Sequence, residues 1–381
     1  MNKLGWGLAM SLVSGAIMAA PLDTEELRLE RAQETMGPLT QRYEAQVDQL
    51  IQRYRADDGE LTATRKVAED ASALWRAAVE DVQGGFFDDR ALYWNRLAAR
   101  TRLKQSDPGF AIVPWQREIM LSTLEKASRG MSDIHFDDDS DIKILLTGFD
   151  PFRLDDHIDQ SNPSGLAALA LDGQRWQVDG RKVQVETVLI PVRFADFDQG
   201  LIESLLTPYL RDRRVDMVVT VSMGRDGFDL ERFPGRNRSA EAGDNLNVVT
   251  GASKTQPLPP TLNGTDLNGP EFLEFSLPVA QLQKATGRYE IRDNRQVTTR
   301  QGDREARSLL SLRDATSVAG SGGGYLSNEI SYRSLLLKQL LESPVPVGHI
   351  HTPKIQGYDE QQNRAIVEQL EAMLKHAVTA L

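Results

Sequence analysis

The sequence has 381 residues and contains no cysteine. Disulfide bonds, thiolate metal sites and a cysteine nucleophile are therefore excluded for this chain. Basic residues are in deficit, because 44 lysines and arginines face 55 aspartates and glutamates, giving a net charge of −11. With no basic surplus to neutralise phosphates, we expect no nucleic-acid partner. The hydrophobic fraction of 40% and the charged fraction of 26% are ordinary for a globular protein.

A long apolar run stands at the N-terminus. Lys3 supplies a positive charge, residues 4–18 are almost wholly apolar or small, and Ala19-Ala20 precedes a proline as a small-residue cleavage point. This run of about 15 residues is shorter than the roughly 20 that span a bilayer. We therefore predict a signal peptide over residues 1–19, a periplasmic or secreted location, and no membrane span after its removal. A short membrane anchor or a buried helix is the alternative.

Residues 20–136 show helical periodicity and few strand signals. Apolar residues recur mostly at three- to five-residue intervals between charged ones, as Leu39, Tyr43 and Val47 do. Glycine-containing turns separate the helical segments. No residue set here has the spacing of a metal or nucleophile site. We therefore interpret this region as a helical cap or a partner-docking module.

The segment 137–141 reads Asp-Asp-Asp-Ser-Asp. It lacks the glycine and the distal glutamate of a calcium loop, so we predict a solvated acidic linker and a domain boundary. Beyond it, the short apolar runs 142–147, 183–191 and 215–221 each open into a loop and alternate with helical segments. This alternation predicts an α/β domain over 142–381, with an open, twisted, largely parallel sheet and helices on both faces, preceded by an all-α segment.

The first motif stands at the end of the first predicted strand. Residues 147–152 read Thr-Gly-Phe-Asp-Pro-Phe, and Asn162 opens an Asn-Pro-Ser segment. This order resembles the opening of pyroglutamyl peptidase I, where two phenylalanines sandwich the flat pyrrolidone ring of the substrate. The resemblance assigns that role to Phe149 and Phe152 and places Asn162 in the same pocket. Apolar ring faces would exclude water from the hydrogen bonds of a neutral lactam. Two core aromatics after a strand are the alternative.

A second match follows another predicted strand. It comprises Met-Gly-Arg at 223–225, Glu-Arg at 231–232 and Asp-Asn at 244–245. These segments resemble the Gly-Arg, Glu-Arg and Asp-Asn sequence of the same family. The resemblance makes Glu231 the acid that orients a catalytic histidine, and it adds Met223 and Gly224 to the substrate site. Taken alone, Glu231 would be interpreted as a surface glutamate.

The third match contains the nucleophile and the base. Residues 322–328 read Gly-Gly-Gly-Tyr-Leu-Ser-Asn and parallel the family's Ala-Gly-Thr-Phe-Val-Cys-Asn. The resemblance makes Ser327 the nucleophile in place of cysteine and adds Tyr325 to the substrate-binding residues. Residues 348–353 read Gly-His-Ile-His-Thr-Pro and resemble the family's Phe-Ile-His-(apolar)-Pro, which places the general base at His351. A glycine-rich turn into a helix brings backbone N–H groups near the nucleophile, as an oxyanion site requires. We expect His349 to support His351, since a His-x-His metal pair would lack a third ligand and no metal site is predicted.

The resemblance covers residues 141–381. It implies a hydrolase that removes N-terminal pyroglutamate from peptides through a Ser327-His351-Glu231 acyl-enzyme mechanism, and the predicted signal peptide makes it an exported one. No cofactor is expected; the partner is a peptide substrate, and an oligomer is compatible with the sequence. Loss of an oxidisable thiol gives an exported enzyme a reason to use serine. The alternatives are an inactive relative that binds pyroglutamyl peptides, or an interaction protein that acts through its helical region.

The sequence also departs from the family pattern. Arg153-Leu154 replaces a glycine pair after Pro-Phe, the loop 249–270 is expanded, and the region 284–307 is unusually charged. These departures bear on the details of the pocket more than on the fold.

Overall fold

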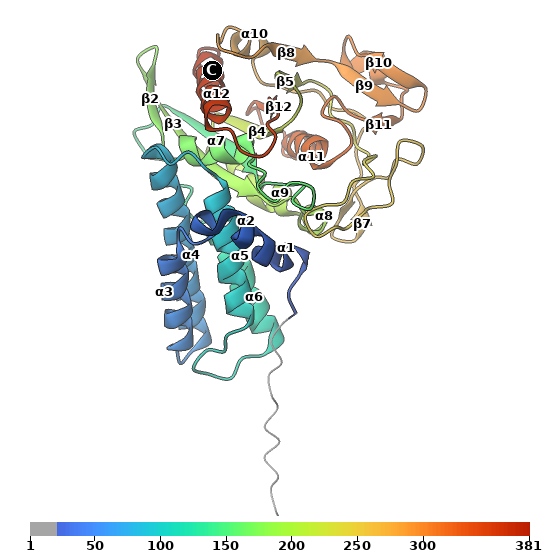
Figure 1. Ribbon diagram of the computed structural model, residues 1–381. Coiled ribbons are helices and arrows are strands. Elements are labelled where there is room, and N and C mark those ends of the chain that lie inside the picture. The colour runs from blue at the N-terminus through green and yellow to red at the C-terminus, as the bar shows by residue number, and fades with distance from the viewer. Residues whose placement is uncertain (1–20) are drawn as a thin grey trace, which may run out of the picture.

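A computed structural model describes residues 21–381, so the predicted signal peptide lies outside the described residues. Figure 1 shows a bundle of helices standing against one side of an α/β domain. The predicted fold class, a largely parallel α/β sheet preceded by an all-α segment, is confirmed. Within residues 21–381, no helix has the length and apolar character needed to cross a membrane.

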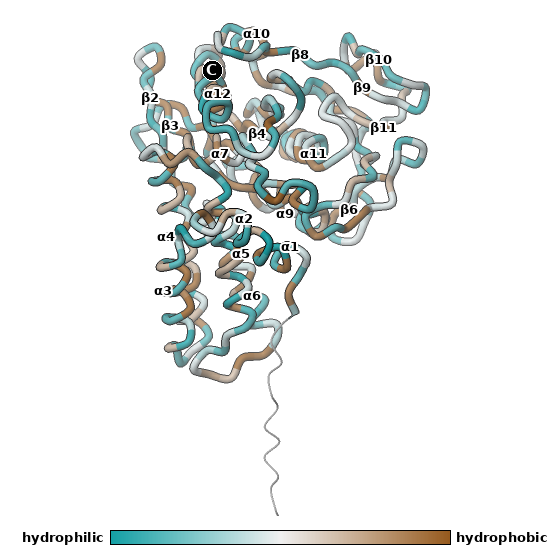
Figure 2. Tube along the Cα trace, viewed as in Figure 1, coloured by the Kyte–Doolittle hydropathy of each residue, from teal (hydrophilic) through white to brown (hydrophobic). Residues whose placement is uncertain are grey.

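The N-terminal bundle is built from amphipathic helices. Its elements are α1 (Thr24–Leu27), α2 (Leu29–Thr40), α3 (Glu44–Arg55), α4 (Glu60–Gln83), α5 (Arg90–Lys104) and α6 (Pro114–Ala127). Figure 2 shows hydrophobic and hydrophilic residues alternating along α3 and α4. The apolar stripes meet in a core that includes Ile51, Val67 and Leu124. Packing of these stripes stabilises the helices, as single helices of this length would be marginal in water.

Seven of the strands in the described residues form the main sheet, in the order β2-β3-β1-β4-β12-β5-β8. Their bounds are β1 Ile142–Phe149, β2 Arg175–Val178, β3 Arg181–Ile190, β4 Met217–Met223, β5 Phe228–Glu231, β8 Ile291–Asn294 and β12 Val347–Thr352. The four central strands β3, β1, β4 and β12 are mutually parallel, and β2 and β5 run antiparallel to β3 and β12. The carboxyl ends of β1, β4 and β12 therefore meet at one edge, where ligands bind in such sheets.

Helices cover both faces of this sheet. The remaining helical elements are α7 Pro163–Leu171, α8 Phe194–Asp198, α9 Leu201–Arg211, α10 Val279–Leu282, η1 Leu309–Leu312, α11 Leu326–Leu340 and α12 Glu360–Val378. Helices α7 and α12 pack on the face that carries Ile144 and Val219, and α9 and α11 pack on the face that carries Leu145 and Val218. The alternation follows from the two-residue period of a strand. Two small sheets complete the domain: β6 (Thr261–Leu262) with β7 (Thr265–Asp266), and β10 (Gly302–Glu305), β9 (Gln296–Thr299) and β11 (Ser317–Ala319).

The helical bundle shares a core with the α/β domain. Trp75 of α4 is fully buried in the cluster that also contains α7, and its indole Nε1 donates to Asp172 Oδ2 at 3.2 Å. The acidic segment 137–141 lies against the β2–β3 hairpin, where Asp137 pairs with Arg175 at 2.5 Å and Asp139 pairs with Lys182 at 2.7 Å. The predicted domain boundaries, with this segment as the linker, stay predictions.

Candidate active site

A buried carboxylate–imidazole pair lies at the carboxyl edge of the sheet. Glu231, the last residue of β5, is fully buried, and its Oε1 lies 2.5 Å from Nδ1 of His351 on β12. The antiparallel pairing of β5 with β12 brings the two residues together. A second contact fixes the carboxylate, because Asn294 Nδ2 donates to Glu231 Oε2 at 2.8 Å. Glu231 and His351 thus have the geometry of an acid–base pair.

The hydrogen bond between these two side chains indicates which imidazole nitrogen carries the proton. Burial raises the pKa of Glu231 and the neighbouring imidazole opposes that rise. A carboxylate only accepts hydrogen bonds, so Nδ1 of His351 carries the shared hydrogen and Nε2 is left with its lone pair. This is the arrangement in which a carboxylate orients a general base and stabilises its protonated form.

His349 is buried beside His351, and its expected supporting role stays a prediction. Its Nδ1 and Nε2 each lie 2.8 Å from a hydroxyl, Thr220 Oγ1 and Ser222 Oγ, so both ring nitrogens are occupied. Burial holds its pKa well below the ordinary value, and the ring stays neutral. It packs edge-on against His351 with ring centroids 4.9 Å apart. Within residues 21–381, no group of three or more His, Asp or Glu side chains could hold a metal ion.

Gly224 makes room for the base. A Cβ at this position would lie 2.5 Å from Cβ of His351, closer than two carbon atoms can approach. Its N–H donates to the Thr352 carbonyl at 2.9 Å, which extends the β4–β12 pairing to the end of the sheet. Gly224 therefore acts on the position of the imidazole, whereas Met223 lines the pocket described next.

Ser327 lies in a small pocket with most of the residues that the resemblance assigned to the substrate. The pocket has a volume of about 30 Å³ and is lined by Phe149, Phe152, Asn162, Val192, Ser222, Met223, Tyr325, Leu326 and Ser327. These residues come from the ends of β1 and β4, the loops that follow β1 and β3, the N-cap of α7 and the start of α11. Phe149 is almost fully buried, and its ring stacks on Phe197. The pocket is mainly apolar, as its aromatic walls require.

The nucleophile candidate occupies the first turn of α11. Tyr325 is the N-cap, so Ser327 is the second helical residue and its N–H has no partner within the helix. The pairing of β4 with β12 links the pocket to the acid–base pair. Ser222 of β4 lines the pocket and lies opposite His351 of β12. Among the described residues, however, no hydrogen bond joins Ser327 Oγ to the His351 imidazole. His351 does not line the pocket itself, and Ser222 is the residue that links the pocket to the histidine.

Sequence reasoning missed a supporting residue from the helical region. Asp89, just before α5, is buried and accepts from Ser161 Oγ at 2.5 Å and from the Asn162 backbone N–H at 2.9 Å. Asn162 in turn caps α7 through Ser164 N and donates to the Asp150 carbonyl. Asn294 was also missed. Both lie in segments without a recognisable motif, so the sequence carried no signal for them.

The presence of Arg153-Leu154 after Pro-Phe, in place of a glycine pair, has a structural reason. Arg153 adopts φ 62°, in the left-handed region that favours glycine. Leu154 is buried in a cluster with Tyr93 and Trp94 of α5. Its carbonyl also accepts from Arg31 of α2. The chain here keeps the turn that glycine would favour, and it uses the next side chain to bind the helical bundle.

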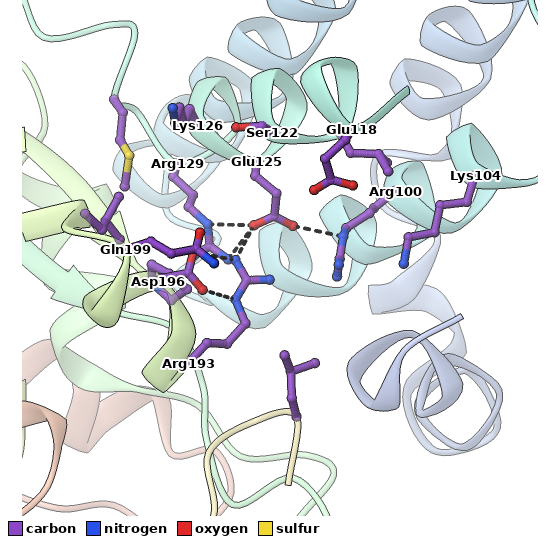
Figure 3. Close-up of a pocket in the computed structure, with 15 residues that line it drawn as sticks. Arg100, Lys104, Glu118, Ser122, Glu125, Lys126, Arg129, Arg193, Asp196 and Gln199 are labelled. Atoms are coloured by element: carbon purple, nitrogen blue, oxygen red, sulfur yellow. Dashed lines mark hydrogen bonds and ion pairs between the residues drawn. The ribbon is translucent and has the colours of Figure 1, made fainter. Parts of the chain in front are cut away.

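A separate cavity of about 280 Å³ lies where α5 and α6 meet the loop after β3. Figure 3 shows that charged side chains crowd it, with Glu125 at the centre. Glu125 pairs with Arg193 at 2.8 Å, Arg129 at 3.0 Å and Arg100 at 3.5 Å. Burial would raise the pKa of Glu125, but the arginines hold it well below the ordinary value. Carboxylates of the chain already pair with these arginines. We therefore interpret the cluster as the contact through which the helical region packs against the α/β domain.

Solved structures similar to this chain include pyrrolidone carboxyl peptidase from Pyrococcus furiosus. One match has 20% identity and a TM-score of 0.44 and covers 63% of this chain and 99% of that one. A point mutant of the same enzyme matches with 21% identity and a TM-score of 0.43, covering 63% of this chain and 100% of that one.

Family models match both parts of the chain. The model described as the PA0049 N-terminal domain matches residues 12–125, and the model described as the PA0049 C-terminal domain matches residues 143–275 and 285–356. The relative "Uncharacterized protein PA0049" of Pseudomonas aeruginosa is 30% identical, over 78% of this chain and 70% of its own length. With helical region and α/β domain both matched, this chain belongs to the PA0049 family.

Proposed function

We propose that this protein is an exported hydrolase that removes N-terminal pyroglutamate from peptides, with Ser327 as nucleophile, His351 as base and Glu231 as its orienting acid. The observation that carries the proposal is the buried Glu231–His351 pair beside a small apolar pocket that contains Ser327. Ser-His-acid sets of this kind perform acyl transfer on unrelated folds, and they are recognised by geometry rather than by sequence position.

The chemistry follows from the assigned roles. His351 Nε2 takes the hydroxyl proton as Ser327 Oγ attacks the carbonyl carbon of the pyroglutamyl residue. The unpaired N–H groups of the first α11 turn favour the developing oxyanion. Collapse of the intermediate breaks the C–N bond, and His351 returns the proton to the leaving amine. Water then adds to the acyl-serine with the same base, releasing pyroglutamate and regenerating Ser327.

Substrate entry requires the pocket to open. Its volume of about 30 Å³ holds about one or two water molecules, less than a five-membered lactam needs. Phe149 is nearly fully buried, whereas Phe152 is half-buried on the loop after β1. We therefore propose that Phe152 moves to admit the ring, and that the same closure brings Ser327 within hydrogen-bond distance of His351.

A pyroglutamyl reporter amide tests the proposal directly. The mature protein should release the chromophore between about pH 6 and pH 9. Ser327→Ala and His351→Ala should abolish the release, and both should keep the circular-dichroism spectrum of the wild type. No turnover by the intact protein across this range would overturn the hydrolase assignment.

A binding protein is the second candidate, and the missing Ser327–His351 hydrogen bond favours it. In that case calorimetry with a pyroglutamyl dipeptide would give binding without product, and Ser327→Ala would bind equally well. A hydrolase would instead convert the dipeptide during the titration.

Export rests on the predicted signal peptide over residues 1–19. Expression of the full chain in a bacterium with a periplasm should yield a mature protein whose N-terminal residue is Ala20. A product retained in the cytosol at full length would contradict this part of the proposal.

A further inference from the structure

A second groove flanks the turn that leads to Ser327. It has a volume of about 370 Å³ and lies between the glycine turn at 320–324, strand β9 and the loop that carries Ser239 and Lys254. The small sheet of β9, β10 and β11 forms its outer wall, on the side of the molecule away from the helical bundle (Figure 1). Gly323 and Gly324 line this groove, and the next residues, from Tyr325 to Ser327, line the pocket around Ser327. One continuous segment of chain therefore borders both the groove and the pocket.

The groove is directly connected to the acid–base pair. Asn294 Nδ2 donates both to Glu231 Oε2, at 2.8 Å, and to the carbonyl of groove-lining Ser321, at 2.9 Å. Arg225, another lining residue, places Nη2 3.8 Å from Glu231 Oε1. The turn itself is held by reciprocal backbone hydrogen bonds between Gly320 and Gly323. The wall of the groove and the catalytic carboxylate therefore keep a fixed relation.

The groove carries one cationic group that has no carboxylate partner among residues 21–381. Its charged lining residues are Arg225, Lys254 and Asp303. Arg225 pairs with Asp229 at 3.1 Å, and Asp303 accepts from Thr298 Oγ1 at 2.7 Å. Within this part of the chain, Lys254 is exposed and forms no ion pair, which leaves its ammonium group available to a ligand.

We propose that this groove binds the peptide chain that follows the scissile bond and selects chains that carry a carboxylate. This inference rests on the proposed function. Even when it opens for the ring, the small apolar pocket has no room for the residues that follow, and the groove borders the same turn on the other side of Tyr325. A polar groove with a free ammonium group suits an extended peptide, and charge complementarity favours an acidic side chain or a free C-terminal carboxylate.

Matched peptides separate the two sources of the carboxylate. Pyroglutamyl tetrapeptides with Asp, Asn or Lys at the third residue are compared, each as free acid and as C-terminal amide. We expect kcat/KM to be higher for Asp than for Lys by between about threefold and tenfold, as partly exposed charge pairs allow. A preference for the free acid over the amide would assign the carboxylate to the C-terminus, and a preference for Asp in both forms would assign it to the side chain.

Lys254→Glu should invert the Asp-to-Lys ratio, and raised salt should reduce it. Lys126→Glu is the matched control, because Lys126 of α6 is also exposed and makes the same charge change far from the groove. The control should leave the ratio unchanged. Equal kcat/KM for all peptides in the wild type, with reporter turnover intact, would overturn the groove assignment and leave the hydrolase assignment standing.

A binding experiment keeps the inference testable if turnover is absent. The tripeptides Ala-Asp-Ala and Ala-Lys-Ala, which lack the pyroglutamyl ring, are titrated into the wild type and Lys254→Glu by calorimetry. Tighter binding of Ala-Asp-Ala to the wild type, with the order reversed in the variant, supports the groove independently of catalysis. Binding of neither peptide in a protein without turnover overturns it.

Discussion

Asp89 Oδ2 accepts the backbone N–H of Asn162 at 2.9 Å, across the junction between the helical bundle and the α/β domain. Asn162 lines the pocket around Ser327 and caps α7, so a residue from the bundle holds one wall of the candidate site. The bundle is therefore part of the structure that shapes the pocket, and the two parts of the chain should act together.

Asp89→Asn should reduce the pH dependence of stability. Burial and the nearby Asp88 raise the pKa of Asp89 to about 7 in the folded protein. The folded state then binds more protons than the unfolded chain, so the stabilisation present at low pH is lost as the pH rises through about 7. The lowered pKa of His349 makes the folded state less stable as the pH falls below the ordinary histidine pKa. This contribution is the same in the wild type and in the variant, so the difference between the two proteins isolates Asp89. Their difference in the free energy of unfolding should change by on the order of 2 kcal/mol between pH 5 and pH 8 in urea titrations.

Glu231→Gln should cut catalysis while the fold is kept. An amide has nearly the same shape as the carboxylate but does not stabilise the protonated imidazole of His351. We expect kcat on the reporter amide to fall by about 10³- to 10⁴-fold with little change in KM. Proton NMR gives a readout independent of turnover: the wild type should show a downfield resonance for the His351 Nδ1 proton. Persistence of that resonance in the variant would contradict the assigned contact.

Gly224→Ala should displace His351, because the added Cβ would lie 2.5 Å from that of the histidine. Turnover should fall toward that of His351→Ala, and the melting temperature should drop, since Cβ of His351 can move only with its backbone. Gly37→Ala is the control: a Cβ there meets nothing within 4 Å and its φ is not positive. That variant should keep both activity and melting temperature.

Arg153→Gly should stabilise the protein. A non-glycine residue at φ 62° is strained, and glycine removes the strain at a smaller entropic cost. The ion pair with Asp156 that is lost is exposed and contributes little. We expect a gain of up to about 1 kcal/mol in chemical denaturation. Arg153→Ala loses the same ion pair without relieving the backbone, so a gain of equal size in that variant would refute the explanation.

Asp150→Asn should weaken the attachment of the bundle. Its carboxylate is buried between Arg96 at 2.6 Å and Arg129 at 2.5 Å, and both arginine side chains are nearly inaccessible. Removing the negative charge leaves the buried Arg96 without its carboxylate partner and Arg129 with Glu125 alone, at a cost of about 3–5 kcal/mol in the free energy of unfolding. Glu69→Gln, which breaks only surface ion pairs with Arg53 of α3 and Arg65 of α4, should change stability by less than about 1 kcal/mol. Similar losses in both variants would refute the role assigned to Asp150.

The sequence by itself determined the architecture. The apolar runs at 142–147, 183–191 and 215–221 lie within or overlap β1, β3 and β4, because buried parallel strands need continuous apolar residues that periodicity detects. The same holds for the N-terminal helices, whose apolar stripes recur at helical spacing. The site candidates were found through ordered motifs, and they stay predictions as catalytic and binding residues.

Only the tertiary structure decided how these residues meet. The pairing of Glu231 with His351 depends on β5 running antiparallel to β12, across 120 residues of chain. The support of the pocket by Asp89, and the separation of Ser327 from the imidazole, depend on packing between segments that no local pattern relates. Local sequence sets which elements form, since their propensity and periodicity are local. The distances between side chains from different elements follow from the packed fold as a whole.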